Sequence, residues 1–208
     1  VARAWVRAME DNIGVDKDIP APDVNTNGQI MSWRLDEFET INMRSEPGMI
    51  TAKPLSLGGS LGRESATSQG GVYVLNEVLK HIPIKGTTKR VIVQGFGNVG
   101  SFVTQILHEQ GFTVIGISDV TGALYDTNGL DIPMHMNAKN EGKTMTDIAN
   151  EKNIELISNE ELLSKECEIL IPAALYANVV KPLSQLSDTV GSIQEAKLKQ
   201  FNGVLSKV

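Results

Sequence analysis

A strand, a glycine-rich turn, a helix and a second strand follow one another between Lys89 and Asp119, and this succession constrains the fold most. Residues 91–93 are a short β-branched run that stops before a glycine, and residues 112–117 are a second such run. Between them, apolar residues recur at helical spacing: Val99, Val103, Ile106 and Leu107. Strand, helix and strand in this rhythm predict right-handed βαβ units and a parallel sheet.

The turn reads Gly95-Phe96-Gly97-Asn98-Val99-Gly100, which has the spacing G-x-G-x-x-G. It follows a strand, opens a helix, and is followed by an acidic residue, Asp119, at the end of the next strand. Gly95 permits the tight turn, Gly97 lets the backbone approach a pyrophosphate, and Gly100 lets the helix pack close to the sheet. The start of the helix offers N–H groups to phosphates, and Asp119 can accept hydrogen bonds from a ribose. The alternative, a glycine turn that holds no ligand, is disfavoured by this complete context.

Further elements are indicated on both sides of this unit. We expect helices over residues 1–9, 30–41, about 72–82 and 193–205, a capping box at Ser158 and Glu161, and a strand over residues 168–171 that Pro172 closes. Residues 18–27 contain two prolines and several Asn, Asp and Thr residues, so they form a loop. The fold class is therefore α/β, with an incomplete Rossmann-type doubly wound parallel sheet.

Composition excludes several kinds of protein. The chain has 208 residues and a formal net charge of -6 without a Lys/Arg cluster, which argues against nucleic acid as a partner. No apolar stretch approaches the length of a membrane span. Cys167 is the single cysteine, so no internal disulfide can form, which fits a cytoplasmic location. The histidines, at positions 81, 108 and 135, lack metal-ligand spacing, so we expect no metal site.

Two other segments are candidates for chemistry. In the loop over residues 19–27, Pro20 and Pro22 stiffen the approach to Asp23, a candidate proton carrier, although composition alone favours an Asx-turn aspartate. Residues 58–70 combine glycines with Ser and Thr hydroxyls. That stretch is either a ligand-binding loop or a flexible connection, and the residues alone favour neither.

Taken together, these segments resemble the glutamate dehydrogenase family over roughly residues 1–180. The matching segments are Pro20-Ala21-Pro22-Asp23-Val24-Asn25-Thr26-Asn27, Lys53-Pro54, Gly58-Gly59-Ser60-Leu61-Gly62-Arg63, Ala66-Thr67, Gln94 to Gly100, Ile117-Ser118-Asp119 and Ile169 to Ala174. Residues 58–67 resemble the glutamate-specific branch, because the leucine, phenylalanine and valine dehydrogenases typically lack this stretch. Ala52 stands where the family usually has glycine.

The resemblance implies a role for each matching residue. Asp23 would move protons, Thr67 and Asn98 would contact the nicotinamide cofactor, and Asp119 would hold its adenosine ribose. The turn Gly95 to Gly100, with Phe96 and Val99 inside it, would hold the pyrophosphate. The implied reaction is the reversible oxidative deamination of glutamate to 2-oxoglutarate and ammonia. Asp119 favours NAD because a carboxylate repels a 2′-phosphate, and NADP stays an alternative.

The resemblance also implies an organisation. We expect residues 1–70 to end a substrate domain, residues 71–185 to form a truncated dinucleotide-binding domain, and residues 186–208 to be a divergent tail, within a cytoplasmic homo-oligomer. The family's substrate-binding lysines lie upstream of Val1, which itself opens a helix, so we expect a chain cut from a longer one. The alternative to a dehydrogenase is an inactive piece that at most binds dinucleotide or a partner chain.

Overall fold

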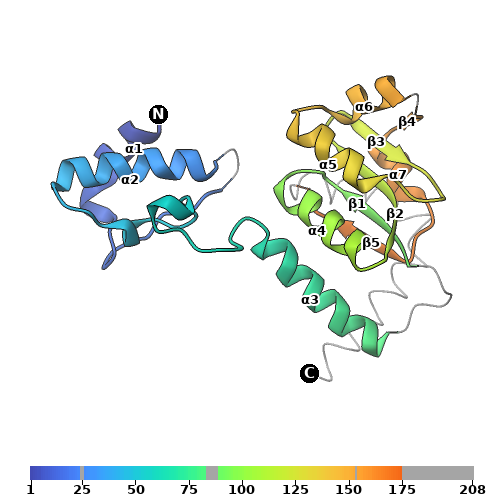
Figure 1. Cartoon of the computed structure of the whole chain (residues 1–208), viewed down its shortest axis with the longest axis horizontal. Helices are drawn as coiled ribbons and strands as arrows, with labels where there is room; N and C mark the ends of the chain where they lie inside the picture. Colours follow the sequence, from blue (N-terminus) through green and yellow to red (C-terminus); the bar gives the residue numbers. More distant parts are fainter. Residues whose placement is uncertain (24–25, 83–88, 153, 175–208) are drawn as a thin grey trace. The chain divides into compact units, whose positions relative to one another are not determined.

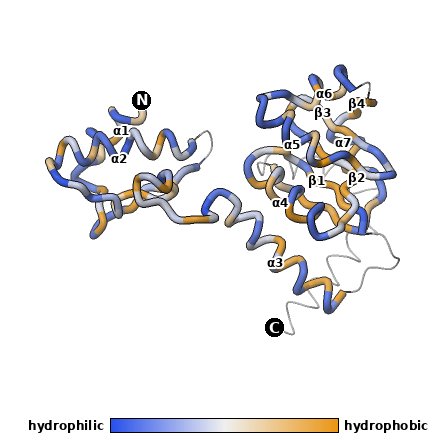
Figure 2. Tube along the Cα trace, in the orientation of Figure 1, coloured by the Kyte–Doolittle hydropathy of each residue, from blue (hydrophilic) through white to orange (hydrophobic). Residues whose placement is uncertain are grey.

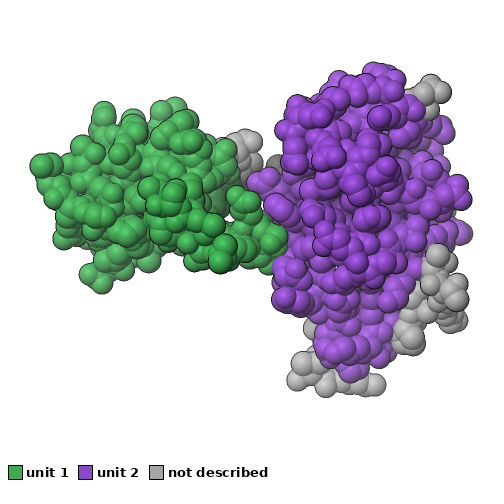
Figure 3. Space-filling view, in the orientation of Figure 1, with its two compact units in different colours: residues 1–67 green, residues 68–208 purple. Residues whose placement is uncertain are grey.

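The computed structural model describes residues 1–23, 26–82, 89–152 and 154–174, and the chain divides into two compact units. Unit 1 comprises residues 1–67 and unit 2 begins at Ser68 (Figure 3). The expected domains, with their boundary at residue 70, stay a prediction. The expected tail helix over residues 193–205 lies outside the described residues.

Unit 1 is built on two helices, α1 (Ala2–Met9) and α2 (Gly28–Asn42), as the spacing of apolar residues predicts. Three short 3-10 helices complete it: η1 (Glu10–Asn12), η2 (Pro47–Met49) and η3 (Leu55–Leu57). The helices pack against each other around a core of Val6, Ile13, Met31, Leu35, Phe38, Met49 and Ile50. Asn27 caps α2 by accepting the N–H of Ile30 at 3.1 Å, and the helix ends where Met43 turns left-handed.

Unit 2 combines a sheet with helices (Figure 1). Its elements in chain order are α3 (Ala66–His81, which starts in unit 1), β1 (Arg90–Gln94), α4 (Asn98–Glu109), β2 (Thr113–Asp119), β3 (Gly122–Tyr125), α5 (Ile132–Asn140), α6 (Met145–Lys152), β4 (Leu156–Ile157), α7 (Asn159–Ser164) and β5 (Ile169–Pro172). The strand order is β4-β3-β2-β1-β5. Strands β1, β2 and β5 are parallel. One half of the expected capping box is present, since Ser158 Oγ accepts the N–H of Glu161 at 3.0 Å, while Glu161 Oε1 accepts from Lys165 Nζ at 2.8 Å.

The three strands that the sequence predicts, β1, β2 and β5, are parallel as expected, and on one side the sheet is extended by two further strands, with β3 antiparallel to β2 and β4 antiparallel to β3. The cause is a two-residue turn between β2 and β3. Asp119 Oδ1 accepts both the N–H and the hydroxyl of Thr121, each at 2.6 Å, and Gly122 has a φ of +148°. Such a short turn returns the chain directly as an antiparallel strand, whereas a parallel neighbour needs a longer crossover.

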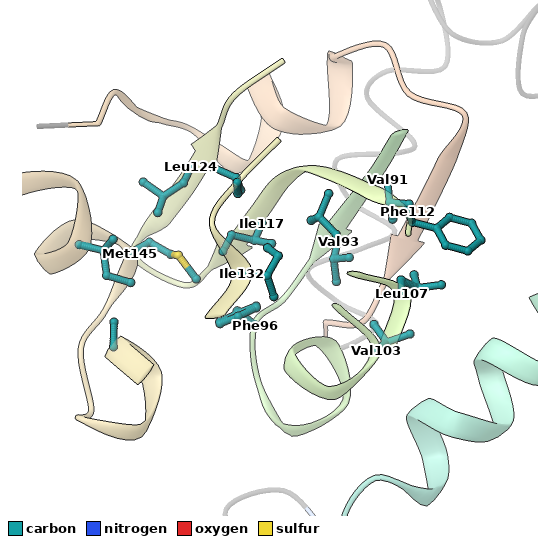
Figure 4. Packing of buried hydrophobic residues seen from close by; sticks show 14 of the residues in the cluster. Val91, Val93, Phe96, Val103, Leu107, Phe112, Ile117, Leu124, Ile132 and Met145 are labelled. Carbon is teal, nitrogen blue, oxygen red and sulfur yellow. The ribbon is translucent and has the colours of Figure 1, made fainter. Parts of the chain in front are cut away.

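Apolar side chains cover both faces of the sheet. Val91 and Val93 point into the larger cluster, which the helices α3 to α6 complete, and Ile92 points to the opposite face beside Leu162 of α7. This alternation is the period of two expected of a strand. Figure 4 shows ten labelled members of the larger cluster, and Figure 2 shows the central strands as hydrophobic. Such a rigid base holds the turn between β1 and α4 in place.

None of the helices in the described part of the chain combines the length and apolar character needed to cross a membrane.

Candidate functional site

The turn between β1 and α4 is fixed by its first glycine. Gly95 has a φ of +92°, which favours glycine, and a Cβ there would lie 2.8 Å from the carbonyl oxygen of Ala173, just after β5. The N–H of Gly95 donates to Ser118 Oγ on β2 at 3.3 Å, and Ala173 donates its N–H to Gln94 at 2.8 Å. The strands on both sides of β1 therefore hold this turn, and no side chain fits at position 95.

The other two glycines differ in what surrounds them. A Cβ on Gly100 would overlap the carbonyl oxygen of Gly95, so that glycine is required for α4 to start where it does. Gly97 has an ordinary φ of -75°, and no atom of the described residues lies within 4 Å of the place where its Cβ would be. Neither backbone conformation nor packing among these residues therefore explains Gly97. A glycine beside such open space lets a ligand approach the backbone closely.

The start of α4 provides the polar groups of this cradle, which we define as residues 95–100. The N–H of Ser101 donates to the carbonyl of Gly97 at 3.0 Å. Helix geometry leaves the N–H groups of residues 98–100 without a carbonyl one turn earlier, and they carry the positive end of the helix dipole. Asn98 is exposed, Val99 is 41% exposed, and the ring of Phe96 is buried in the core. Phe96 can therefore contact a ligand through its backbone only.

Asp119 lies where the sequence predicts it, at the carboxyl end of β2, which is the parallel neighbour of β1. Its carboxylate is held firmly, since Oδ1 accepts two hydrogen bonds from Thr121 and Oδ2 accepts the N–H of Met145, at the start of α6, at 3.1 Å. A carboxylate has about four acceptor sites, so these three bonds leave room for one more. The role of Asp119 toward a ribose stays a prediction.

Ser68 is a residue of this region that the sequence did not single out. It is buried on α3, and its hydroxyl donates to the carbonyl of Val99 at 2.8 Å, which joins the first turn of α3 to the first turn of α4. Thr67, the predicted cofactor contact, is exposed and directly precedes it in the sequence. Ser68 lies 31 residues from Val99, and nothing in the local pattern distinguishes it from its Ser and Thr neighbours.

Lys139, near the end of α5, was also not singled out. Its Nζ donates to Ser101 Oγ at 2.7 Å, and Ser101 is completely buried in the first turn of α4. The side chain of Lys139 is itself half-buried, and this burial lowers its pKa from the ordinary value of a lysine. The contact joins residues 38 positions apart, so it is visible only in the folded chain.

In unit 1, the loop that carries Asp23 is held at both ends. Pro20 accepts the N–H of Thr51 at 3.0 Å, and Asn27 caps α2. Thr26 adds a local brace, because its hydroxyl donates to the carbonyl of Asp23 at 2.6 Å. The carboxylate of Asp23 belongs to an exposed residue. Asp23 and Asn98 lie in different units, so their convergence at one nicotinamide stays a prediction.

The glycine pair that follows Pro54 belongs to a built turn. Gly58 has a φ of +82°, the N–H of Gly59 donates to the carbonyl of Pro54 at 3.0 Å, and a Cβ on Gly59 would overlap the carbonyl oxygen of Lys53. Lys53 itself donates from Nζ to the carbonyl of Ile50 at 2.8 Å. Gly58 and Gly59 therefore belong to a compact, hydrogen-bonded turn. This turn argues against a flexible connection at these two positions. Its function stays a prediction.

The described residues contain no group of three or more His, Cys, Asp or Glu side chains placed to hold a metal ion.

Comparison with known proteins places the chain among dehydrogenases. Residues 58–195 match the profile described as Glutamate/Leucine/Phenylalanine/Valine dehydrogenase, and residues 1–40 match the dimerisation domain of Glu/Leu/Phe/Val dehydrogenases. The catabolic NAD-specific glutamate dehydrogenase RocG of Bacillus subtilis is 47% identical over 175 residues, which are 84% of this chain and 40% of that protein. The cryptic catabolic NAD-specific glutamate dehydrogenase GudB of the same organism is 48% identical over 183 residues, 87% of this chain and 42% of that protein.

Among solved structures, the leucine-bound hetero-hexameric glutamate dehydrogenase of Thermus thermophilus is similar, with a TM-score of 0.74 and 30% identity. That match covers 83% of this chain and 40% of the other. The chain thus spans about two fifths of the length of these relatives. Because the dehydrogenase profile alone matches more than half of the sequence, and the cradle described above lies inside it, the chain belongs to the Glutamate/Leucine/Phenylalanine/Valine dehydrogenase family.

Proposed function

We propose that unit 2 binds NAD at the cradle and that the whole protein catalyses the NAD-dependent oxidative deamination of glutamate to 2-oxoglutarate and ammonia. The observation that carries the proposal is Gly97, which sits at the start of α4 beside open space and has no conformational need to be glycine. The two Bacillus subtilis relatives are named NAD-specific glutamate dehydrogenases, which supports both the cofactor and the substrate.

Each proposed site residue of this chain would have its own role. The N–H groups of residues 98–100 would bind the pyrophosphate, and Asp119 would accept hydrogen bonds from the adenosine ribose. Asn98 and Thr67 would contact the nicotinamide, which, when bound, accepts a hydride from the α-carbon of the substrate. Asp23, on its anchored loop, would carry protons to and from the amino group as it is released.

Three finer points belong to the same proposal. Glutamate is favoured over branched or aromatic amino acids because residues 58–67, with the turn at Gly59, resemble the glutamate-specific branch. NAD is favoured over NADP because a 2′-phosphate would meet the carboxylate of Asp119. The matched dimerisation domain supports assembly of several copies, and the cytoplasm is the expected location.

Dinucleotide binding tests the cradle directly. We expect the chain to bind NAD in calorimetry, and Gly97→Ala to weaken binding at least tenfold without lowering the melting temperature, because the added methyl meets the ligand and no described protein atom. Gly71→Ala is the matched control, since a Cβ at that exposed position of α3 also meets no described atom within 4 Å. Equal affinity of Gly97→Ala and the native chain would refute the cradle as the site.

Turnover distinguishes the dehydrogenase from its alternative. Absorbance of reduced cofactor at saturating glutamate measures the reaction of the whole protein, and Asp23→Asn should abolish most of it while leaving NAD affinity unchanged, because this change removes the proton carrier only. Binding of NAD by the whole protein without glutamate-dependent reduction would favour the alternative, a protein that binds dinucleotide without turnover.

A further inference from the structure

Lys139 is a half-buried cation at the first turn of α4. Its Nζ lies 2.7 Å from Ser101 Oγ, and Ser101 is fully buried. Just before α5, the N–H of Leu130 donates to the carbonyl of Val114 near the start of β2. Near the end of α5, Lys139 contacts α4, so the helix runs toward the first turn of α4. Helices α4 and α5 lie next to each other in Figure 1.

The charge environment of Lys139 differs from that of Lys143 and Lys165, two other lysines of unit 2. Lys143 lies 2.9 Å from Glu141 and 2.8 Å from Glu151, and Lys165 lies 2.8 Å from Glu161. No carboxylate of the described residues forms an ion pair with Lys139 within 4 Å. A half-buried ammonium that is paired only with a neutral hydroxyl gains little to offset its lost hydration.

The helix beside it adds to this imbalance. Ser101 makes the first backbone hydrogen bond of α4, to Gly97, so the ammonium is anchored at the positive end of the helix dipole. Two positive features therefore lie together at the cradle, and the cradle residues themselves include no charged side chain. A dianion bound there would compensate the charge of the ammonium and that of the positive end of the helix dipole.

We propose that Lys139 supplies the positive charge that complements the pyrophosphate of the bound dinucleotide. This inference rests on the proposed NAD site and assigns the site a charged residue outside the glycine turn. The action is electrostatic and needs no direct contact. Ser101 lies three residues, or about 4.5 Å of helix rise, after Asn98. The ammonium lies a further 2.7 Å from Ser101 Oγ, so its distance from the start of α4 is of the order of the screening length, about 8–10 Å in physiological salt, and its charge is only partly screened there.

The test compares variants of the full chain by calorimetry with NAD and with ADP-ribose at low and high salt. Lys139→Met should weaken both ligands about three- to tenfold at low salt and should reduce the salt dependence of binding. Lys139→Gln should behave alike, and Lys139→Arg should restore most of the affinity because it keeps the charge. Lys165→Met is the matched control, since that lysine pairs with Glu161, and it should leave both affinities unchanged.

The outcomes separate the two proposals. A native chain that binds neither NAD nor ADP-ribose would refute the cradle, and the role of Lys139 with it. Native binding that Lys139→Met and Lys139→Gln leave unaltered would overturn the role of Lys139 and keep the cradle. In a parallel titration with NADP, a loss restricted to NADP, with NAD affinity unchanged, would overturn it too, because the charge would then serve a 2′-phosphate. Rescue by Lys139→Arg together with a lower salt dependence of Lys139→Met supports the proposal.

Discussion

Gly100→Ala should destabilise unit 2, although alanine is the better helix former. A Cβ at this position of α4 would overlap the carbonyl oxygen of Gly95 and lie 3.4 Å from the Cβ of Ala173. The overlapped atom is backbone, and the preceding residue, Gln94, is tied to the end of β5 by the N–H of Ala173, so the carbonyl of Gly95 cannot turn aside as a side chain would. Overpacking costs about 1–3 kcal/mol, and the upper end applies here. The helix preference of alanine over glycine returns about 1 kcal/mol, which leaves a net loss of about 2 kcal/mol.

Thermal unfolding followed by circular dichroism measures this loss. A net change of about 2 kcal/mol should lower the melting temperature of unit 2 by roughly 5–10 °C. Gly71→Ala in α3 makes the same chemical change where no described atom lies within 4 Å, so it should leave the melting temperature unchanged or raise it. A Gly100→Ala chain that melts at or above the native temperature would show that packing of α4 against Gly95 does not require glycine.

Three further changes test the structure. Ala52→Gly should raise the urea midpoint by an amount equivalent to about 1 kcal/mol, because Ala52 has a φ of +51°; a lower midpoint would contradict this strain. Ser68→Ala leaves the carbonyl of Val99 without its donor and should cost about 1–3 kcal/mol, measured by the same midpoint, and a neutral result would show that water replaces the hydroxyl. Arg90 holds the pKa of Glu168 below its ordinary value, chiefly by a side-chain hydrogen bond, so the stability from this pair is present above the ordinary pKa and lost as pH falls through the lowered one. Glu168→Gln should therefore flatten the loss of urea midpoint between about pH 5 and pH 3, and an unchanged slope would exclude Glu168 as its cause.

The sequence determined the central strand, turn and helix because the reasons for them are local. Gly95 needs a positive φ, and Gly100 must leave space for the carbonyl of Gly95, five residues earlier. Both requirements therefore involve only residues that are close together in the sequence. The position of Asp119 at the end of the neighbouring strand followed from the βαβ rhythm, because right-handed crossovers place sequential strands side by side. The family also followed from the motifs, which the matches to known dehydrogenases confirm.

The direction of β3 was decided by a turn that the β-branched pattern does not reveal. The runs of apolar residues predict strands without saying which way each one points, and the side chain of Asp119 sets the hairpin through two bonds to Thr121. The same carboxylate thereby became a structural cap as well as a candidate ligand.

Only the tertiary structure brought Ser68 and Lys139 to the cradle. Each reaches the first turn of α4 from an element more than 30 residues away, and each makes one hydrogen bond to it. A lysine near the end of a short helix and a serine in a polar run are ordinary residues in a linear reading. What Ser68 and Lys139 do depends on how deeply each is buried and on which charges lie nearby. Both are set only when the helices pack on the sheet.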